Sequence, residues 1–69
     1  MESVIVKNAA ILSGEPVIRG TRVPFRALTD YLAGGDSLDD FLEQYPKVTH
    51  EAAVAALEEA RQNLVAHLQ

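Results

Sequence analysis

Apolar residues recur along the chain with two different spacings. Up to residue 23 they form short β-branched runs separated by turn residues, so Ser3–Val6 and Val17–Arg19 are predicted to be extended. A turn is predicted between them at Ser13–Pro16, and Gly20 ends the second segment. From residue 24 onward the apolar residues recur every three or four positions, as in amphipathic helices. The pattern therefore predicts a mostly α fold that begins with a short β-type arm.

Start and stop signals predict three helices after the arm. Proline suits the first turn of a helix, and serine or threonine accepts hydrogen bonds from its first free N–H groups. Carboxylates favour the positive end of the helix dipole, and glycine favours the left-handed residue that often ends a helix. The first helix is predicted to begin at Pro24, with Thr21 as its best cap, and to end at Gly34–Gly35. The second is predicted to begin at Ser37, with Asp39 and Asp40 in its first turn, and to end at Pro46. The third is predicted to begin at Thr49, with Glu51 in its first turn.

Each predicted helix has an apolar face, and that of the third helix is wider than one core contact requires. Either the N-terminal arm or another helix, including one from a second copy, can cover the excess, and the sequence leaves both open. The faces comprise Phe25, Leu28, Tyr31 and Leu32, then Leu38, Phe41, Leu42 and Tyr45, and finally Ala53, Leu57, Ala60, Leu64 and Leu68.

The order arm, helix, helix, short turn, helix predicts one domain over residues 1–69, with the arm at 1–23 and the helices at 24–69. The four residues 46–49 match the short turn of a helix-turn-helix, a motif that also occurs in proteins that never bind DNA. A domain this small buries only about 60% of its unfolded surface, so its hydrophobic content of 48% favours a further apolar interface. We expect a homo-oligomer, with a dimer as the simplest form.

Charge is distributed unevenly along the chain, whose net charge is −4. Residues 1–35 hold four cations against three carboxylates, whereas residues 36–69 hold two against seven. The acidic balance argues against tight nucleic-acid binding by a single copy, because phosphate neutralisation supplies most of that affinity. The basic first half keeps DNA among the candidate partners.

Catalytic and metal chemistry finds little support in the sequence. There is no cysteine, and the two histidines, His50 and His67, are too far apart for a zinc motif. Glycine-rich phosphate loops, leader sequences and apolar runs long enough to span a membrane are also missing from the pattern. We therefore expect a cytoplasmic protein that is not an enzyme, uses no cofactor or metal and has no membrane partner.

Three arginines of the arm, Arg19, Arg22 and Arg26, are the candidate partner-binding residues. The planar guanidinium binds carboxylates or phosphates through two parallel hydrogen bonds. Either an acidic protein surface or DNA fits this chemistry, and so does an ion pair or backbone contact within the chain itself. Lys47, Thr49 and His50 join the three arginines as candidate DNA contacts, although the third helix that follows them is acidic.

The run Ile-Leu-Ser-Gly-Glu-Pro-Val-Ile-Arg-Gly-Thr-Arg-Val-Pro at residues 11–24 resembles the signature of the prokaryotic domain-of-unknown-function family four-three-three. The resemblance continues through residues 32–35, 41–42, 45–46, 49 and 54–57. It implies a homeodomain-like helix-turn-helix and the role of a VapB-type antitoxin in a type II toxin–antitoxin system.

The partner that this resemblance implies is a PIN-like ribonuclease toxin, whose active site is a cluster of acidic residues around a divalent metal. Arg19 or Arg22 would enter that site, an inference that rests on charge. The resemblance also implies that a dimer binds its own operator DNA. The alternatives are a stand-alone DNA-binding transcriptional regulator and a structural, homo-oligomerising domain.

Overall fold

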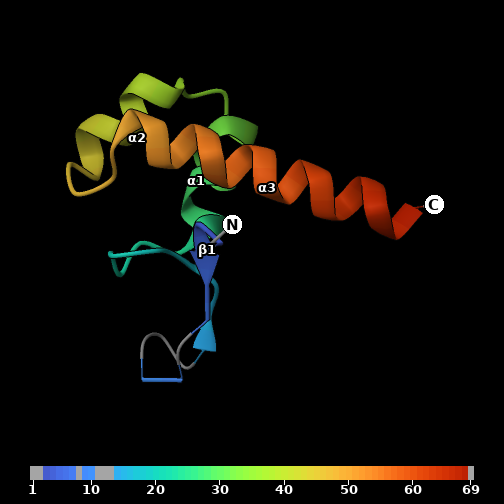
Figure 1. Cartoon of the computed structure of the whole chain (residues 1–69). Helices are drawn as coiled ribbons and strands as arrows, with labels where there is room; N and C mark the ends of the chain where they lie inside the picture. The colour runs from blue at the N-terminus through green and yellow to red at the C-terminus, as the bar shows by residue number, and fades with distance from the viewer. Residues whose placement is uncertain (1–2, 8, 11–13, 69) are drawn as a thin grey trace.

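The computed structural model describes residues 3–7, 9–10 and 14–68. Its three helices follow a two-stranded antiparallel sheet, so the predicted mostly helical fold with a β-type arm is confirmed (Figure 1). The predicted turn residue Ser13 lies outside the described residues. The elements are β1 (Ile5–Val6), β2 (Val17–Ile18), α1 (Phe25–Ala33), α2 (Leu38–Gln44) and α3 (His50–Leu68).

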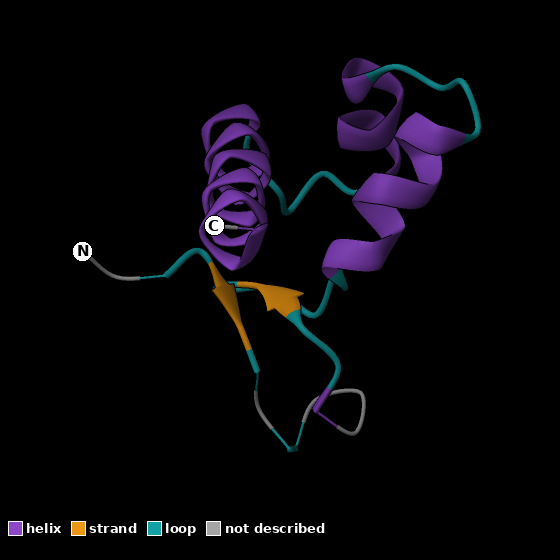
Figure 2. Ribbon diagram, turned by 90° about the vertical axis from the view of Figure 1, so that its right-hand side faces the viewer, coloured by secondary structure: helices purple, strands orange, loops and turns teal. Residues whose placement is uncertain are grey.

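The two strands pair antiparallel beside α3, with Ile5 opposite Ile18 and Val6 opposite Val17 (Figure 2). Each strand has two residues and is shorter than the predicted extended segment. Hydrogen bonds continue beyond the pairing, because the Arg19 N–H donates to the Val4 carbonyl at 2.6 Å. Both residues of β2 are buried, so this strand is the part of the arm that joins the core.

The start of α1 differs from the prediction. Pro24 is the N-cap residue and no side chain caps the helix, so the prediction that Thr21 caps it is wrong. The Thr21 hydroxyl instead donates to the Ile18 carbonyl at 2.8 Å and accepts from the Val23 N–H at 3.0 Å. These bonds close the turn after β2, and the extended Pro24, with φ −68° and ψ 142°, leads from that turn into the helix.

The other predicted helix boundaries are confirmed by their hydrogen bonds. Gly35 follows α1 with φ 94°, a left-handed conformation that suits glycine. Ser37 and Asp40 form a reciprocal capping box at the start of α2, with both N–H···O distances at 3.1 Å. The Thr49 hydroxyl accepts from the Ala52 N–H at 3.0 Å at the start of α3.

The core lies where β2, α1, α2 and the first half of α3 meet. Alanines form the buried face of α3, which allows the other elements to approach it closely. Tyr31 and Tyr45 extend the core around Phe41, with ring centroids 5.6 and 4.9 Å from the Phe41 ring. The buried residues are Val17, Ile18, Leu28, Phe41, Val48, Ala53 and Ala56.

The predicted apolar faces are only partly buried. Leu32 on α1 and Leu64 and Leu68 on α3 are exposed, because none of the described elements covers them. The last turns of α3, residues 61–68, are exposed throughout and extend beyond the rest of the molecule (Figure 1). In the part of the chain that the structure describes, no helix combines the length and apolar character that a membrane span requires.

Candidate functional site

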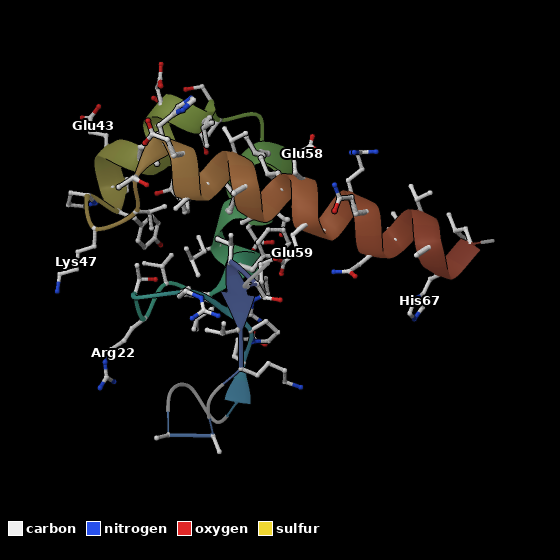
Figure 3. The ribbon with its side chains drawn as sticks, in the orientation of Figure 1. Arg22, Glu43, Lys47, Glu58, Glu59 and His67 are labelled. Atoms are coloured by element: carbon white, nitrogen blue, oxygen red, sulfur yellow. The ribbon has the colours of Figure 1, made fainter. Side chains whose placement is uncertain are left out.

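A groove runs between the arm and the turn that joins α2 to α3. Its volume is about 780 Å³, and most of its lining side chains are apolar. Two cations, Arg22 from the arm and Lys47 from the turn, also line it, and both extend from the same side of the molecule (Figure 3). The complete lining is Val6, Val17, Gly20, Thr21, Arg22, Val23, Pro24, Gln44, Tyr45, Pro46 and Lys47.

The two cations of the groove meet no neutralising partner among the described residues. Arg22 and Lys47 are both exposed. Among the residues that the structure describes, neither side chain forms a hydrogen bond or an ion pair. Folding thus brings two charges from distant parts of the sequence to one apolar surface and leaves both available to an anionic partner.

The other two candidate arginines, Arg19 in the arm and Arg26 in the first turn of α1, have contacts within the chain. The Arg19 Nε donates to the Ser3 carbonyl at 2.7 Å, which fastens the beginning of the arm to the residue after β2. Arg26 lies 3.7 Å from Glu15 on a separate hollow beside α1. The three arginines therefore do not form one surface, and only Arg22 reaches the groove.

The candidate DNA contacts at the start of α3 are divided in the same way. Lys47 lies on the groove, but Thr49 and His50 are not among its lining residues. The Thr49 hydroxyl is engaged as the cap of α3. His50 is exposed as the first residue of that helix. Of the six predicted residues, the structure brings together Arg22 and Lys47.

One residue that positions this site could not be found from the sequence. The Glu59 carboxylate on α3 accepts hydrogen bonds from the backbone N–H groups of Val4 at 2.9 Å and Ile5 at 3.3 Å. These bonds hold β1 against α3, and Val6 of β1 forms part of the groove wall. Because more than 50 residues separate the partners, no local pattern around Glu59 predicts the contact.

An acidic hollow of about 400 Å³ lies on another side of the helices. Partial burial raises the pKa of the Tyr31 phenol above its ordinary value of 10.0, and the nearby Tyr45, Asp36 and Asp40 raise it further. Within residues 3–7, 9–10 and 14–68, no group of three or more His, Asp or Glu side chains is placed to hold a metal ion.

The groove offers binding chemistry. Its cations favour carboxylates or phosphates, and its apolar walls favour a partner that also buries hydrophobic surface. The Thr21 hydroxyl, which lines it, is already engaged in the turn after β2.

Comparison with known proteins places these features in a wider group. A 48-residue stretch is 38% identical to "Uncharacterized protein y4eO" of Sinorhizobium fredii (strain NBRC 101917 / NGR234), and the match covers 70% of this chain and 22% of that protein. The fold is similar to the crystal structure of a DUF433 member protein from Anabaena variabilis ATCC 29413, with a TM-score of 0.76 and 29% identity. That similarity covers 94% of this chain and 64% of the crystallised one.

The chain thus spans less than two thirds of the length of either relative. Over residues 5–60, which include both strands, α1, α2 and the packed half of α3, it matches a single family model. The chain belongs to the family described as "Protein of unknown function (DUF433)".

Proposed function

We propose that this chain is a non-enzymatic binding protein, the antitoxin of a type II toxin–antitoxin pair, and that it inhibits a PIN-like ribonuclease. The observation that carries the proposal is the position of Arg22 and Lys47 on one apolar groove, where no described residue of the chain neutralises them. A ribonuclease whose site is a cluster of carboxylates presents the complementary charge.

The physical argument is electrostatic. Carboxylates that lie close together repel one another, so a cation held in a fixed position beside them is attracted strongly. An arginine binds one carboxylate through two hydrogen bonds, and a lysine adds a point charge beside it. Apolar walls exclude water around such a pair, which strengthens the interaction compared with the same pair on an open surface. Arg22 therefore enters the acidic site in this proposal, and Lys47 supports it.

Binding of operator DNA is the second candidate function, since the same two cations can contact phosphates. Two neutralised phosphates give a slope of only about −2 in log affinity against log salt for each copy. The acidic residues Glu51, Glu58 and Glu59 on α3 oppose the approach of a phosphate backbone. The charge distribution therefore favours a protein partner over nucleic acid. A purely structural, homo-oligomerising domain would need neither cation.

The test is co-expression with the product of the adjacent gene, copurification of the two proteins and a ribonuclease assay. The double variant Arg22→Ala/Lys47→Ala should weaken inhibition by at least about tenfold, as expected for truncation of charged groups at a buried interface. Arg26→Ala is the matched control, because its side chain is exposed and lies on a different hollow. It should leave inhibition unchanged.

Undiminished RNA cleavage with this protein in excess would contradict the antitoxin proposal. Copurification that survives the double variant but fails with the control would show that the groove is not the binding surface. A DNA affinity that falls much more steeply with salt than a slope of about −2 would favour the regulator instead.

A further inference from the structure

The groove between the arm and the α2–α3 turn combines two exposed charges with a large apolar space. Its volume of about 780 Å³ is in the range of small-ligand pockets, roughly 300–1,000 Å³. Arg22 and Lys47 are exposed, whereas Val23 and Tyr45 are half-buried and Val17 is buried. Carboxylates of a partner satisfy the two cations, but only an apolar group gains by contact with the remaining walls.

The apolar walls are held in place by contacts within the chain. Val17 pairs with Val6 in the sheet and forms a bridge to Pro24 on its other side. The Tyr45 ring lies against the Phe41 ring, with their centroids 4.9 Å apart. A groove that is already formed loses little conformational entropy when a side chain fills it, so its apolar contacts contribute more fully to affinity.

The groove is also a positive site on an acidic chain. The net charge of the chain is −4, yet among the described residues none of those that line the groove is acidic. Its other polar side chains, Thr21 and Gln44, are neutral. Arg22 and Lys47 extend from the same side of the molecule and so present both charges to one ligand (Figure 3). The complementary ligand carries two negative charges beside an apolar group.

The walls fit an aliphatic or aromatic side chain better than a nucleotide base. Single-stranded nucleic acids bind largely by stacking bases on aromatic faces. Of the described residues that line the groove, Tyr45 alone is aromatic, and its ring packs against Phe41 and 6.0 Å from Tyr31. Most of the remaining apolar wall consists of valine and proline. The groove therefore favours a protein segment over RNA.

We infer that the groove binds a protein segment in which a large apolar side chain lies between two carboxylates. The apolar side chain packs against Val17, Val23 and Tyr45, and the carboxylates pair with Arg22 and Lys47. Exclusion of water by the apolar contact strengthens both ion pairs. This inference deepens the proposed function, and it rests on that function only for the identity of the protein that carries the segment.

NMR titration of the isotope-labelled chain tests the inference without a partner protein. The probe is the acetylated and amidated peptide Gly-Asp-Phe-Asp-Gly. It should bind with a dissociation constant of about 1 mM or tighter and shift the signals of the Val17 and Val23 methyl groups and of the Arg22 and Lys47 amides. Gly-Asn-Phe-Asn-Gly should bind at least about threefold more weakly, because two ion pairs are lost. Gly-Asp-Ser-Asp-Gly should bind about tenfold more weakly, because the apolar side chain is lost.

Two double variants show whether the preference for carboxylates arises in the groove. Arg22→Gln/Lys47→Gln should bind the aspartate and asparagine peptides equally, because the charges that distinguish them are gone. Arg26→Gln/Arg61→Gln is the matched control, which removes two charges from exposed side chains outside the groove. It should keep the wild-type preference. Circular dichroism of both variants checks that their helicity is unchanged.

Equal binding of the three peptides by the wild type, or no binding at about 10 mM, would overturn the inference. So would an oligouridine that shifts the same signals at a lower concentration, because nucleic acid would then be the preferred ligand. The ribonuclease assay is a separate test. Peptide binding together with undiminished RNA cleavage would refute the antitoxin and support the ligand class of the groove. Inhibition of the ribonuclease without any peptide preference would support the antitoxin and refute this inference.

Discussion

The Glu59 carboxylate accepts a hydrogen bond from the Val4 backbone N–H at 2.9 Å and thereby joins the last helix to the first described residues of the chain. The Ile5 N–H reaches the other carboxylate oxygen at 3.3 Å. An edge strand needs partners for its outward N–H groups, and a helical glutamate supplies them here. Glu59, whose negative charge would repel a phosphate, thus holds the arm against α3.

Glu59→Ala should destabilise the protein by about 1.5–3 kcal/mol, because two hydrogen bonds to a charged group are lost and the Val4 and Ile5 N–H groups are left without that acceptor. Urea unfolding measures this loss, and amide hydrogen exchange of Val4 and Ile5 should accelerate. Glu58→Ala is the control, since its exposed ion pair with Arg61 contributes only about 0.2–1 kcal/mol. Equal losses for the two variants would refute the anchoring role.

Arg19→Ala should loosen the arm, because its Nε no longer holds the Ser3 carbonyl. The expected loss in free energy of unfolding is about 0.5–1.5 kcal/mol, the net value of a typical hydrogen bond. Limited proteolysis should show faster cleavage of the arm in this variant than in Arg22→Ala. Cleavage at the same rate in both variants would mean that the Arg19 contact does not restrain the arm.

Ser37→Ala should destabilise α2 by about 1 kcal/mol, because the side chain that accepts from the Asp40 N–H is removed. Ser37→Asp is the control variant, since aspartate is an equally good N-cap and should retain most of the stability. Thermal unfolding of both variants measures the difference. A stability of Ser37→Ala equal to that of the wild type would argue against the capping box.

Tyr31 should titrate above the ordinary tyrosine value of 10.0, because partial burial raises the pKa of its phenol. The ultraviolet phenolate signal lost in Tyr31→Phe identifies its titration. Above a pH of about 10 the unfolded chain releases this proton first, so stability should decline with rising pH through the folded-state pKa. Below that pH the group should leave stability unchanged. An unshifted midpoint would contradict the effect of burial.

The local signals of the sequence predict most of the helix boundaries, because caps act over three or four residues. Ser37 and Thr49 bond to backbone N–H groups three positions away, and Gly35 adopts its own left-handed conformation. The prediction for Thr21 was wrong because its hydroxyl had a closer alternative in the turn after β2. The residue type of Thr21 indicated a side chain that bonds to nearby backbone groups, but it did not indicate which backbone groups these would be.

The candidate site was only partly predictable for the same reason. Its residue types were evident from the arm and from the α2–α3 turn, and Arg22 and Lys47 were both named. The sequence could not distinguish the roles of the three arginines that lie within eight residues of each other. Arg19 binds the Ser3 carbonyl, Arg26 lies beside Glu15, and Arg22 lines the groove, and each of these positions depends on the fold.

The sequence by itself determined a mostly helical chain with a β-type arm, its family and its supply of arginines, since these depend on residue types and short spacings. The tertiary structure alone decided that Glu59 anchors the arm and that Arg22 and Lys47 line one groove. It also decided that Leu64 and Leu68 face solvent. The physical reason is that each of these outcomes depends on residues far apart in sequence, and only packing around the core sets their distances.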